Sequence, residues 1–256
     1  MSVALPLLTT MRQDCYVLPT ALLSAHTGFA GSTFTDLSPQ MPGILRHWQT
    51  LELQPDGLLL GYLGAAALAV WQQWLPRHRD QTVRVVDPVM GDQGKLYRGF
   101  DAHYVEAMQM LVAHATVITP NPTEAQLLLG EPLQTTAWTE AAALALAQRV
   151  AERFAVAVVV TGVPLVSGAV GVSGCAGGTP WMLTQRRLAG HYFGTGDIFA
   201  SVLCGGLLAK LDLHAASALA ATFLTRALTA TAATARDPRL GVAYAAELPW
   251  LSSQLQ

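Results

Sequence analysis

Residues 191–197 read His-Tyr-Phe-Gly-Thr-Gly-Asp and stand directly before an apolar run. Gly194 and Gly196 allow the backbone to approach a ligand closely. A helix that begins here offers unpaired N–H groups and the positive end of its dipole, which suit an anion such as phosphate. Asp197 would stand beside that anion, where a carboxylate can take a proton from a nucleophile that attacks phosphorus. An ordinary helix cap fits the same residues, so this segment alone leaves both interpretations open.

A second group of polar residues surrounds two predicted strand ends. Asp87 and Asp92 flank one turn, and Asn121 and Glu124 open the helix that follows the next strand. Three carboxylates at one rim repel each other unless a cation lies between them, and Mg²⁺ binds through few carboxylates, waters and substrate phosphates. Asn121 and Glu124 also have the spacing of a capping box. The pattern therefore predicts either a magnesium site or structural caps, and capping by Glu124 is compatible with metal contact through water.

Predicted strands and helices alternate and carry these residues at the strand ends. Buried strands are predicted at 56–61, 82–87, 115–119 and 156–161, and shorter strands at 16–19, 166–172 and 180–183. Helices are predicted at 65–74, 100–113, 122–129, 138–154, 197–210 and 213–234. This order is typical of a mainly parallel sheet covered by helices on both faces, with ligands beyond the carboxyl ends of the strands. We therefore predict an active-site rim there.

The composition limits the class of protein. Of the 256 residues, 52% are hydrophobic and 12% are charged, which predicts one large α/β domain over residues 1–256 and a buried subunit interface. The apolar segment 22–34 is the predicted homodimer interface.

A net charge of −2 without a basic run argues against nucleic-acid binding, and no run of about 18 apolar residues predicts a membrane span. Cys15, Cys175 and Cys204 lack disulfide or zinc spacing, which favours reduced thiols and a cytoplasmic protein.

Two further loops were considered as binding sites. The segment 91–95 superficially resembles a phosphate-binding P-loop, but it lacks the GxxxxGK[ST] spacing, so we reject that interpretation. Phosphate binding then falls to the turn at Gly194. The loop Ser24-Ala-His-Thr-Gly-Phe29 combines hydrogen-bonding groups with an aromatic ring and suits a polar heteroaromatic ligand. By itself this loop is a weak signal, because a His and a Thr in a loop are commonly solvated.

Three motifs carry a family resemblance. Asp87-Pro-Val-Met-Gly-Asp92-Gln-Gly-Lys-Leu-Tyr97, Thr119-Pro-Asn-Pro-Thr-Glu124 and Phe193-Gly-Thr-Gly-Asp197 occur in the order and spacing of the pyridoxal kinase family, within the ribokinase-like superfamily. Ser24-Ala-His-Thr27-Gly and Gly61-Tyr62-Leu-Gly64 resemble its vitamin-binding half. The resemblance covers essentially the whole chain. It implies a three-layer α/β/α fold and an ATP- and Mg²⁺-dependent transfer of phosphate to the 5′-hydroxymethyl of pyridoxal, pyridoxamine or pyridoxine.

The resemblance also implies residue roles. Asp197 would be the base, and the backbone of Gly194, Thr195 and Gly196 the anion hole. The nucleotide would be bound by Asp87, Asp92, Tyr97, Thr119, Asn121, Thr161 and Gly162. Mg²⁺ would be bound by Asp87, Asn121 and Glu124, directly or through water. Whether a monovalent cation is also required stays open. The pyridine pocket would contain Ser24, His26, Thr27 and Tyr62.

Two other functions compete with a vitamin B6 kinase. A hydroxymethylpyrimidine kinase acts on a hydroxymethyl group of another flat nitrogen heterocycle, and fold alone does not separate the two. The third candidate is a non-catalytic B6-binding protein. It is motivated by a difference between this chain and the family. Family members have a strand and a serine-containing loop before the segment that resembles residues 3–8. The resemblance therefore predicts that residues 1–256 lack the first strand and form a weak kinase with an open pyridine pocket.

Overall fold

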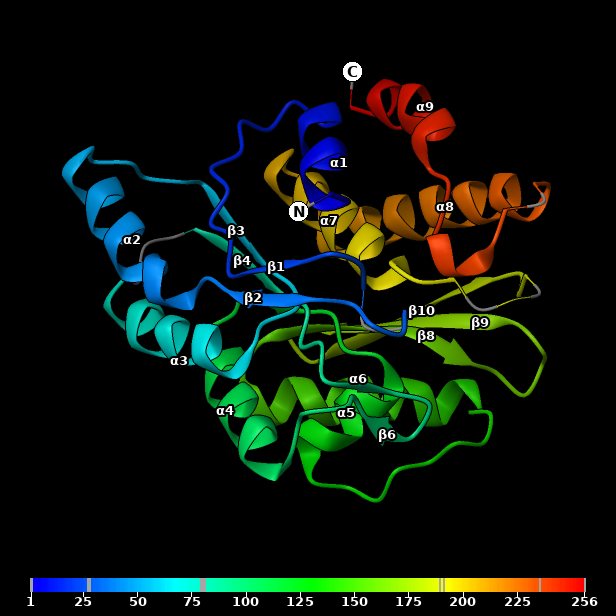
Figure 1. Cartoon of the computed structure of the whole chain (residues 1–256). Coiled ribbons are helices and arrows are strands. Elements are labelled where there is room, and N and C mark those ends of the chain that lie inside the picture. The colour runs from blue at the N-terminus through cyan, green and yellow to red at the C-terminus, as the bar shows by residue number, and fades with distance from the viewer. Residues whose placement is uncertain are drawn as a thin grey trace.

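The computed structural model describes residues 2–26, 29–78, 82–188, 190, 192–234 and 236–255. Its middle layer is a six-stranded sheet of order β10-β9-β8-β7-β4-β3 (Figure 1). The strands are β3 Gly57–Leu60, β4 Val83–Val86, β7 Val117–Ile118, β8 Ala157–Pro164, β9 Val170–Ala176 and β10 Thr179–Gln185. β3, β4, β7 and β8 run parallel, whereas β9 is antiparallel to both of its neighbours. The predicted α/β sheet is confirmed, and its pairing is mixed.

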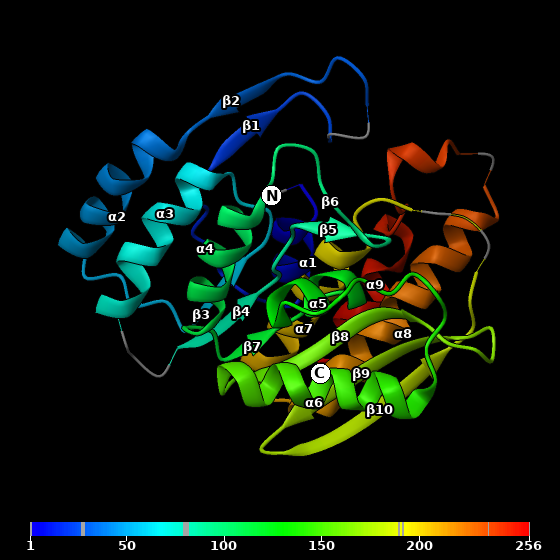
Figure 2. The same ribbon diagram turned by 90° about the horizontal axis from the view of Figure 1, so that it is seen from below.

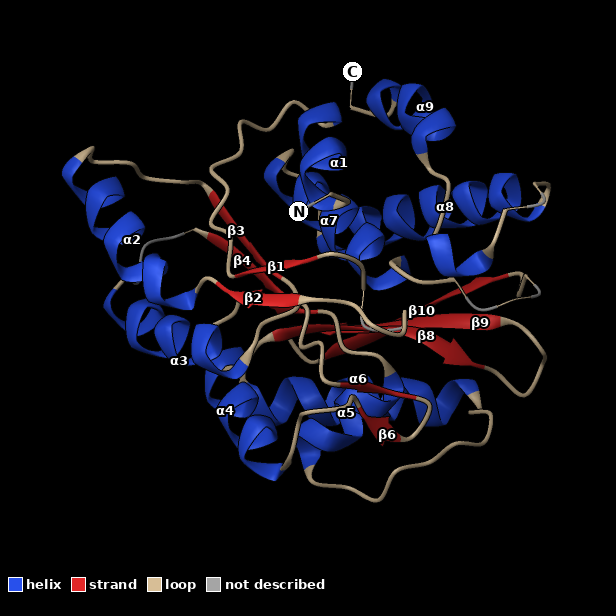
Figure 3. Cartoon of the chain, viewed as in Figure 1, coloured by secondary structure: helices blue, strands red, loops and turns tan. Residues whose placement is uncertain are grey.

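Helices cover both faces of the sheet, as the sequence predicts (Figures 1 and 3). One face carries α1 Ala4–Thr10, α7 Thr195–Leu208, α8 Leu213–Ala232 and α9 Leu248–Ser253. The other carries α2 Met41–Thr50, α3 Ala65–Trp74, α4 Ala102–Val112, α5 Pro122–Leu129 and α6 Glu140–Phe154. Short 3₁₀ turns are η1 Ser38–Gln40, η2 Leu75–Arg77, η3 Pro238–Leu240 and η4 Ala245–Glu247. Each layer of helices buries its own hydrophobic core against the sheet, so the sheet is held rigidly between two cores.

Local signals explain where the helices around the site begin. The Asn121 side chain accepts from the Glu124 N–H and Glu124 accepts from the Asn121 N–H, which confirms the predicted capping box of α5. Gly130 has φ +67° and ends that helix, as predicted. By contrast, α7 begins after Gly194, at φ +82°, without a side-chain cap. Its first N–H groups are therefore left for another partner.

Two predicted strands are misplaced. Residues 16–19 form no strand, and β1 instead spans Ala21–Leu23 and pairs antiparallel with β2, Phe34–Asp36. Pro19 has no N–H to donate to a ladder, which disfavours pairing at the predicted position. The strand expected at 166–172 begins at Val170, because Gly168, at φ +85°, completes a turn before it. A further small hairpin joins β5 Gly91–Asp92 to β6 Lys95–Leu96.

None of the helices in the described ranges combines the length and the apolar character that a membrane-spanning helix needs.

Candidate active site

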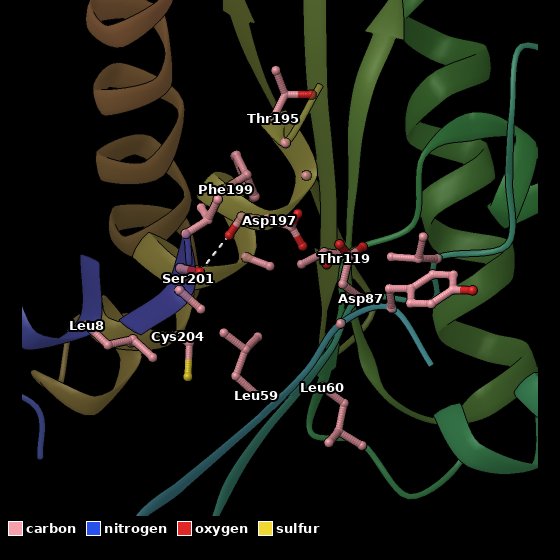
Figure 4. A pocket seen from close by; sticks show the side chains of 18 of the residues that line it. Leu8, Leu59, Leu60, Asp87, Thr119, Thr195, Asp197, Phe199, Ser201 and Cys204 are labelled. Carbon is pink, nitrogen blue, oxygen red and sulfur yellow. Dashed lines mark hydrogen bonds between the residues drawn. The ribbon is translucent and has the colours of Figure 1, made fainter. Parts of the chain in front are cut away.

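The carboxyl ends of β3, β4, β7 and β8 open into one cavity of about 2160 Å³. Every predicted site residue in the described ranges lines it, whereas Thr27 lies outside those ranges. The cavity thus brings together Ser24, His26, Tyr62, Asp87, Asp92, Tyr97, Thr119, Asn121, Glu124, Thr161, Gly162, Gly194, Thr195, Gly196 and Asp197. Figure 4 shows part of this lining between α7 and the strand ends.

The N-terminal turn of α7 faces the ends of β3 and β4. Figure 4 shows Asp197 on this turn, opposite Asp87 and Thr119. A Cβ atom placed on Gly196 would lie 3.3 Å from Asp87 Oδ2, and one on Gly61 would lie 3.6 Å from Asp197 Oδ1. A side chain at Gly196 would therefore crowd Asp87, whereas one at Gly61 would be in ordinary contact with Asp197. The Ser201 hydroxyl donates to the Asp197 carbonyl at 2.6 Å, one turn further into the helix.

Asp87 is a buried acid of the site, and its pKa is strongly raised. It is only 5% exposed, and the Thr119 hydroxyl donates to its Oδ1 at 3.2 Å. Burial and, next, the charge of Asp197 raise the pKa of Asp87, and the hydrogen bond from Thr119 lowers it. The net result is a pKa of about 7. The carboxylate of Asp197 is open to the solvent of the cavity, but the surrounding protein still displaces water and raises its pKa as well. Both groups therefore resist being charged at the same time.

Glu124 and Asn121 fasten the loop after β4 to the loop after β7. Glu124 Oε1 accepts from the Met90 N–H at 3.1 Å, and the Asn121 amide donates to the Gly91 carbonyl at 2.7 Å. Glu124 is buried, and burial, followed by the charge of Asp87, raises its pKa, while the backbone donors oppose this. Both side chains are thus engaged in structure while they line the cavity.

The carboxylates at the strand ends could bind a divalent cation if other groups supplied the rest of its ligands. In the described part of the chain, no ion pair joins Asp87, Glu124 or Asp197 to a basic side chain, so no basic side chain offsets their mutual repulsion. The same residues contain no group of three or more His, Cys, Asp or Glu side chains arranged to hold a metal. The expectation of three converging carboxylates is therefore too strong. Asp92, on β5, accepts from the N–H of the next residue, Gln93, and phosphate oxygens and water would have to complete the site.

Tyr97 lies close enough to the acids of the site for their negative charges to affect its pKa. Burial raises its pKa, and the charges of Glu124, Asp92, Asp87 and Asp197 raise it further. The phenol therefore stays neutral and can donate a hydrogen bond toward an anion in the cavity. Its side chain is 42% exposed, so it is accessible to a ligand.

The end of β8 is shaped by a bulge. The pairing with β9 shifts register between Val160 and Val163, and the Thr161 N–H donates to the Pro120 carbonyl at 2.9 Å. Gly162 takes φ +65°, a conformation that favours glycine. The bulge joins the loops after β7 and β8 and leaves Gly162 exposed at the cavity.

Aromatic rings form the other side of the cavity. Tyr62 and Phe100 line it with their ring centroids 6.0 Å apart, and Phe100 stacks on Tyr104 at 3.7 Å. The Tyr104 hydroxyl donates to the Leu63 carbonyl, which fixes the stack. These surfaces can hold a flat heterocycle. The Ser24 hydroxyl is already used inside the hairpin, where it accepts from the Thr33 N–H at 2.8 Å.

Sequence reasoning missed several cavity residues. Phe100 and the cations Arg98, Arg186 and Arg187 also line the cavity. An available signal was the Arg-Arg pair that lies two residues beyond the last predicted strand and precedes the Gly194 turn. The cavity further continues along the outer side of β3, which pairs only with β4 among the described strands.

The chain was compared with known proteins. The phosphomethylpyrimidine kinase family matches residues 50–239. A pyridoxine/pyridoxal/pyridoxamine kinase from Bordetella avium is 31% identical over 179 residues, which are 68% of this chain and 60% of that protein. The chain thus spans about 60% of the length of the curated relatives that it matches first.

Solved structures match more completely. A pyridoxal kinase from Lactobacillus plantarum has a TM-score of 0.90 and 37% identity, with 99% of this chain and 91% of that chain covered. A protein from Bacteroides thetaiotaomicron, provisionally described as a phosphomethylpyrimidine kinase and crystallised with pyridoxal, has a TM-score of 0.90 and 33% identity. The match covers 100% of this chain and 90% of that one. The chain therefore belongs to the family of pyridoxal and phosphomethylpyrimidine kinases, with their ribokinase-like fold.

Proposed function

We propose that this protein transfers the γ-phosphoryl group of ATP to the 5′-hydroxymethyl group of pyridoxal, pyridoxamine or pyridoxine. The observation that carries this proposal is the position of Asp197. It lies on the uncapped first turn of α7, opposite the buried carboxylate of Asp87. Two relatives support the choice of acceptor, because the Bordetella avium protein and the Lactobacillus plantarum structure are named as kinases of B6 vitamers.

In this mechanism Asp197 takes the proton of the substrate hydroxyl as that oxygen attacks the γ-phosphorus, and the bond from this phosphorus to the bridging oxygen breaks so that ADP leaves. The N–H groups after Gly194 hold the transferred phosphoryl group, and the neutral phenol of Tyr97 donates to a phosphate oxygen. Asp87 would hold Mg²⁺, with Asn121 and Glu124 acting through water, and the ion would draw charge from the phosphates. Tyr62 and Phe100 hold the pyridine ring so that its hydroxymethyl group faces Asp197.

A panel of acceptors tests the function. Pyridoxal, pyridoxamine, pyridoxine and 4-amino-5-hydroxymethyl-2-methylpyrimidine are each incubated with Mg²⁺-ATP, and the phosphorylated product is identified by mass spectrometry. We expect turnover with at least one B6 vitamer and a lower kcat/KM with the pyrimidine. The family match favours the pyrimidine as the second candidate, and preferential turnover of it would replace the proposal. Vitamer binding without any product would instead indicate a non-catalytic protein.

Glu124→Gln tests the proposed contribution to the metal site. The substitution removes the charge and directs an amide group toward one of two backbone N–H donors, at Met90 or Asn121. Loss of such an outer ligand should raise the Mg²⁺ concentration for half-maximal rate by about tenfold. The measurement is a Mg²⁺ titration at saturating nucleotide and vitamer. Glu131→Gln, which changes a surface ion pair with Arg149, is the matched control and should leave the Mg²⁺ titration unchanged. Equal titrations for Glu124→Gln and wild type would contradict the role.

We also propose a homodimer that uses the β1–β2 hairpin. Leu22 is 62% exposed and Phe34 is 50% exposed on these strands, so the hairpin offers apolar surface that a second subunit would cover. Sedimentation at micromolar concentration should give a species of twice the 27.2 kDa chain mass. Stable interfaces of this type bury about 2,000 Å² or more and persist at such dilution. Leu22→Ser together with Phe34→Ser should shift the protein to monomer, and a wild-type monomer would contradict the proposal.

A further inference from the structure

The tip of the β1–β2 hairpin contacts the catalytic turn. The His26 ring stacks on Phe193, with centroids 4.1 Å apart and an interplanar angle of 27°. Its Nε2 lies 2.7 Å from the Arg239 carbonyl, and because a carbonyl only accepts, this nitrogen must donate. Phe29 packs against the same imidazole at 4.7 Å, and the Arg239 guanidinium lies 5.5 Å from the centre of the Phe29 ring. Three segments far apart in the sequence therefore meet at His26.

Phe193 is also confined from its other side. A Cβ atom on Gly241, which has φ +75°, would lie 3.1 Å from the Phe193 carbonyl oxygen. The residue thus sits between the hairpin and the segment that follows η3. In Figure 2 the hairpin extends from the side of α2 and α3 toward that C-terminal segment. The stacked His26 ring therefore holds the Phe193 ring, and little room is left between Gly241 and the Phe193 carbonyl.

Phe193 directly precedes Gly194, the residue at which α7 begins. Gly194 has φ +82°, no side chain caps the helix, and the hydrogen bonds within α7 hold only the residues that follow. A glycine in this conformation has wide backbone freedom, so the direction of the next N–H groups depends on how the preceding residue is held. Phe193, which stacks on His26 and whose carbonyl lies close to Gly241, is the residue directly before this flexible glycine.

We propose that His26 is a positioning residue for phosphoryl transfer: it holds Phe193, and through it the N–H groups of the Gly194 turn, instead of binding the pyridine ring as the family resemblance implies. This assignment rests on the proposed function. Aligned N–H donors matter most where charge develops in the transition state, so their misalignment lowers kcat more than it raises KM. The positioning role therefore predicts a kinetic signature that a ring-binding role does not share.

A double-mutant cycle between His26 and Phe193 tests the assignment. His26→Ala and Phe193→Ala should each lower kcat by about tenfold or more, and the double variant should be no slower than the slower single variant. The KM for pyridoxal should change by less than about twofold. His26→Phe, which keeps a ring for stacking but not the donor, should recover part of the lost kcat. His103→Ala, at an exposed position of α4, is the control and should match wild type.

The alternatives give different results. Additive effects of His26→Ala and Phe193→Ala, or a raised vitamer KM at unchanged kcat, would overturn the assignment and indicate ring binding. If wild type phosphorylates no acceptor, the proposed function fails, and the cycle is then measured by calorimetry with Mg²⁺ and the non-hydrolysable analogue AMPPNP. His26→Ala, Phe193→Ala and the double variant should then weaken AMPPNP binding by the same factor. Unchanged or additive losses of affinity would overturn the assignment there as well.

Discussion

Asp197→Asn should lower kcat by about 10²–10⁴ and leave nucleotide binding nearly unchanged, because this range is typical for the loss of a general base. Asparagine keeps the shape of the side chain but cannot take a proton. The Asp197 side chain is open to the cavity, and its neighbour Ser201 donates only to the Asp197 main-chain carbonyl, so the substitution leaves that bond intact. Steady-state kinetics with pyridoxal, together with calorimetric titration of Mg²⁺-AMPPNP, measure the two effects separately.

Asp212→Asn provides the matched control for this experiment. Asp212 also stands at the start of a helix, where its Oδ1 accepts from the Ala215 N–H at 2.7 Å, and asparagine caps a helix equally well. Its turnover should equal that of wild type. A folded Asp197→Asn protein with turnover within a few-fold of wild type would show that another group takes the proton.

Features fixed by near neighbours in the chain were predictable from the sequence. The capping box of α5 involves residues only three apart, and the glycine that ends this helix follows directly. The buried strands that carry Asp87 and Thr119 are short apolar runs ended by proline-containing turns. Because parallel strands end at one edge, their order also predicted that these polar residues share a rim. The cavity gathers them as expected, while their chemical roles remain predictions.

Features that depend on distant partners were not predictable. The short apolar run at residues 16–19 resembles a strand, but the ladder forms at Ala21–Leu23, where Phe34–Asp36 offers a partner. His26 reads as a ring-binding residue in its loop, yet its hydrogen-bond partner Arg239 is 213 residues away. Asp92 reads as a third carboxylate of the metal site, but the β5–β6 hairpin turns it toward the Gln93 N–H. A single sequence holds no record of such pairings.

Asp87→Asn should stabilise the protein at pH 8 in the absence of Mg²⁺ and nucleotide. The pKa of Asp87 rises from its ordinary value of 3.8 to about 7 on folding, chiefly through burial. Between these values the unfolded chain has released the proton while the folded chain still holds it, so stability falls as pH rises through this window and levels off above about 7. At about 1.4 kcal/mol per pH unit, the loss amounts to at most about 4 kcal/mol. Asparagine removes this loss and still accepts from Thr119.

Urea unfolding of both proteins at pH 5 and pH 8 measures the effect. The free energy of unfolding of wild type should be lower at pH 8, and Asp87→Asn should exceed it there by much more than at pH 5. Asp101→Asn, an exposed cap of α4, should follow wild type at both values. Equal destabilisation by Asp87→Asn at both pH values would show that Asp87 is held by favourable contacts. The expected result would mean that the uncompensated carboxylate destabilises the empty enzyme, so Mg²⁺-ATP should stabilise wild type more than Asp87→Asn.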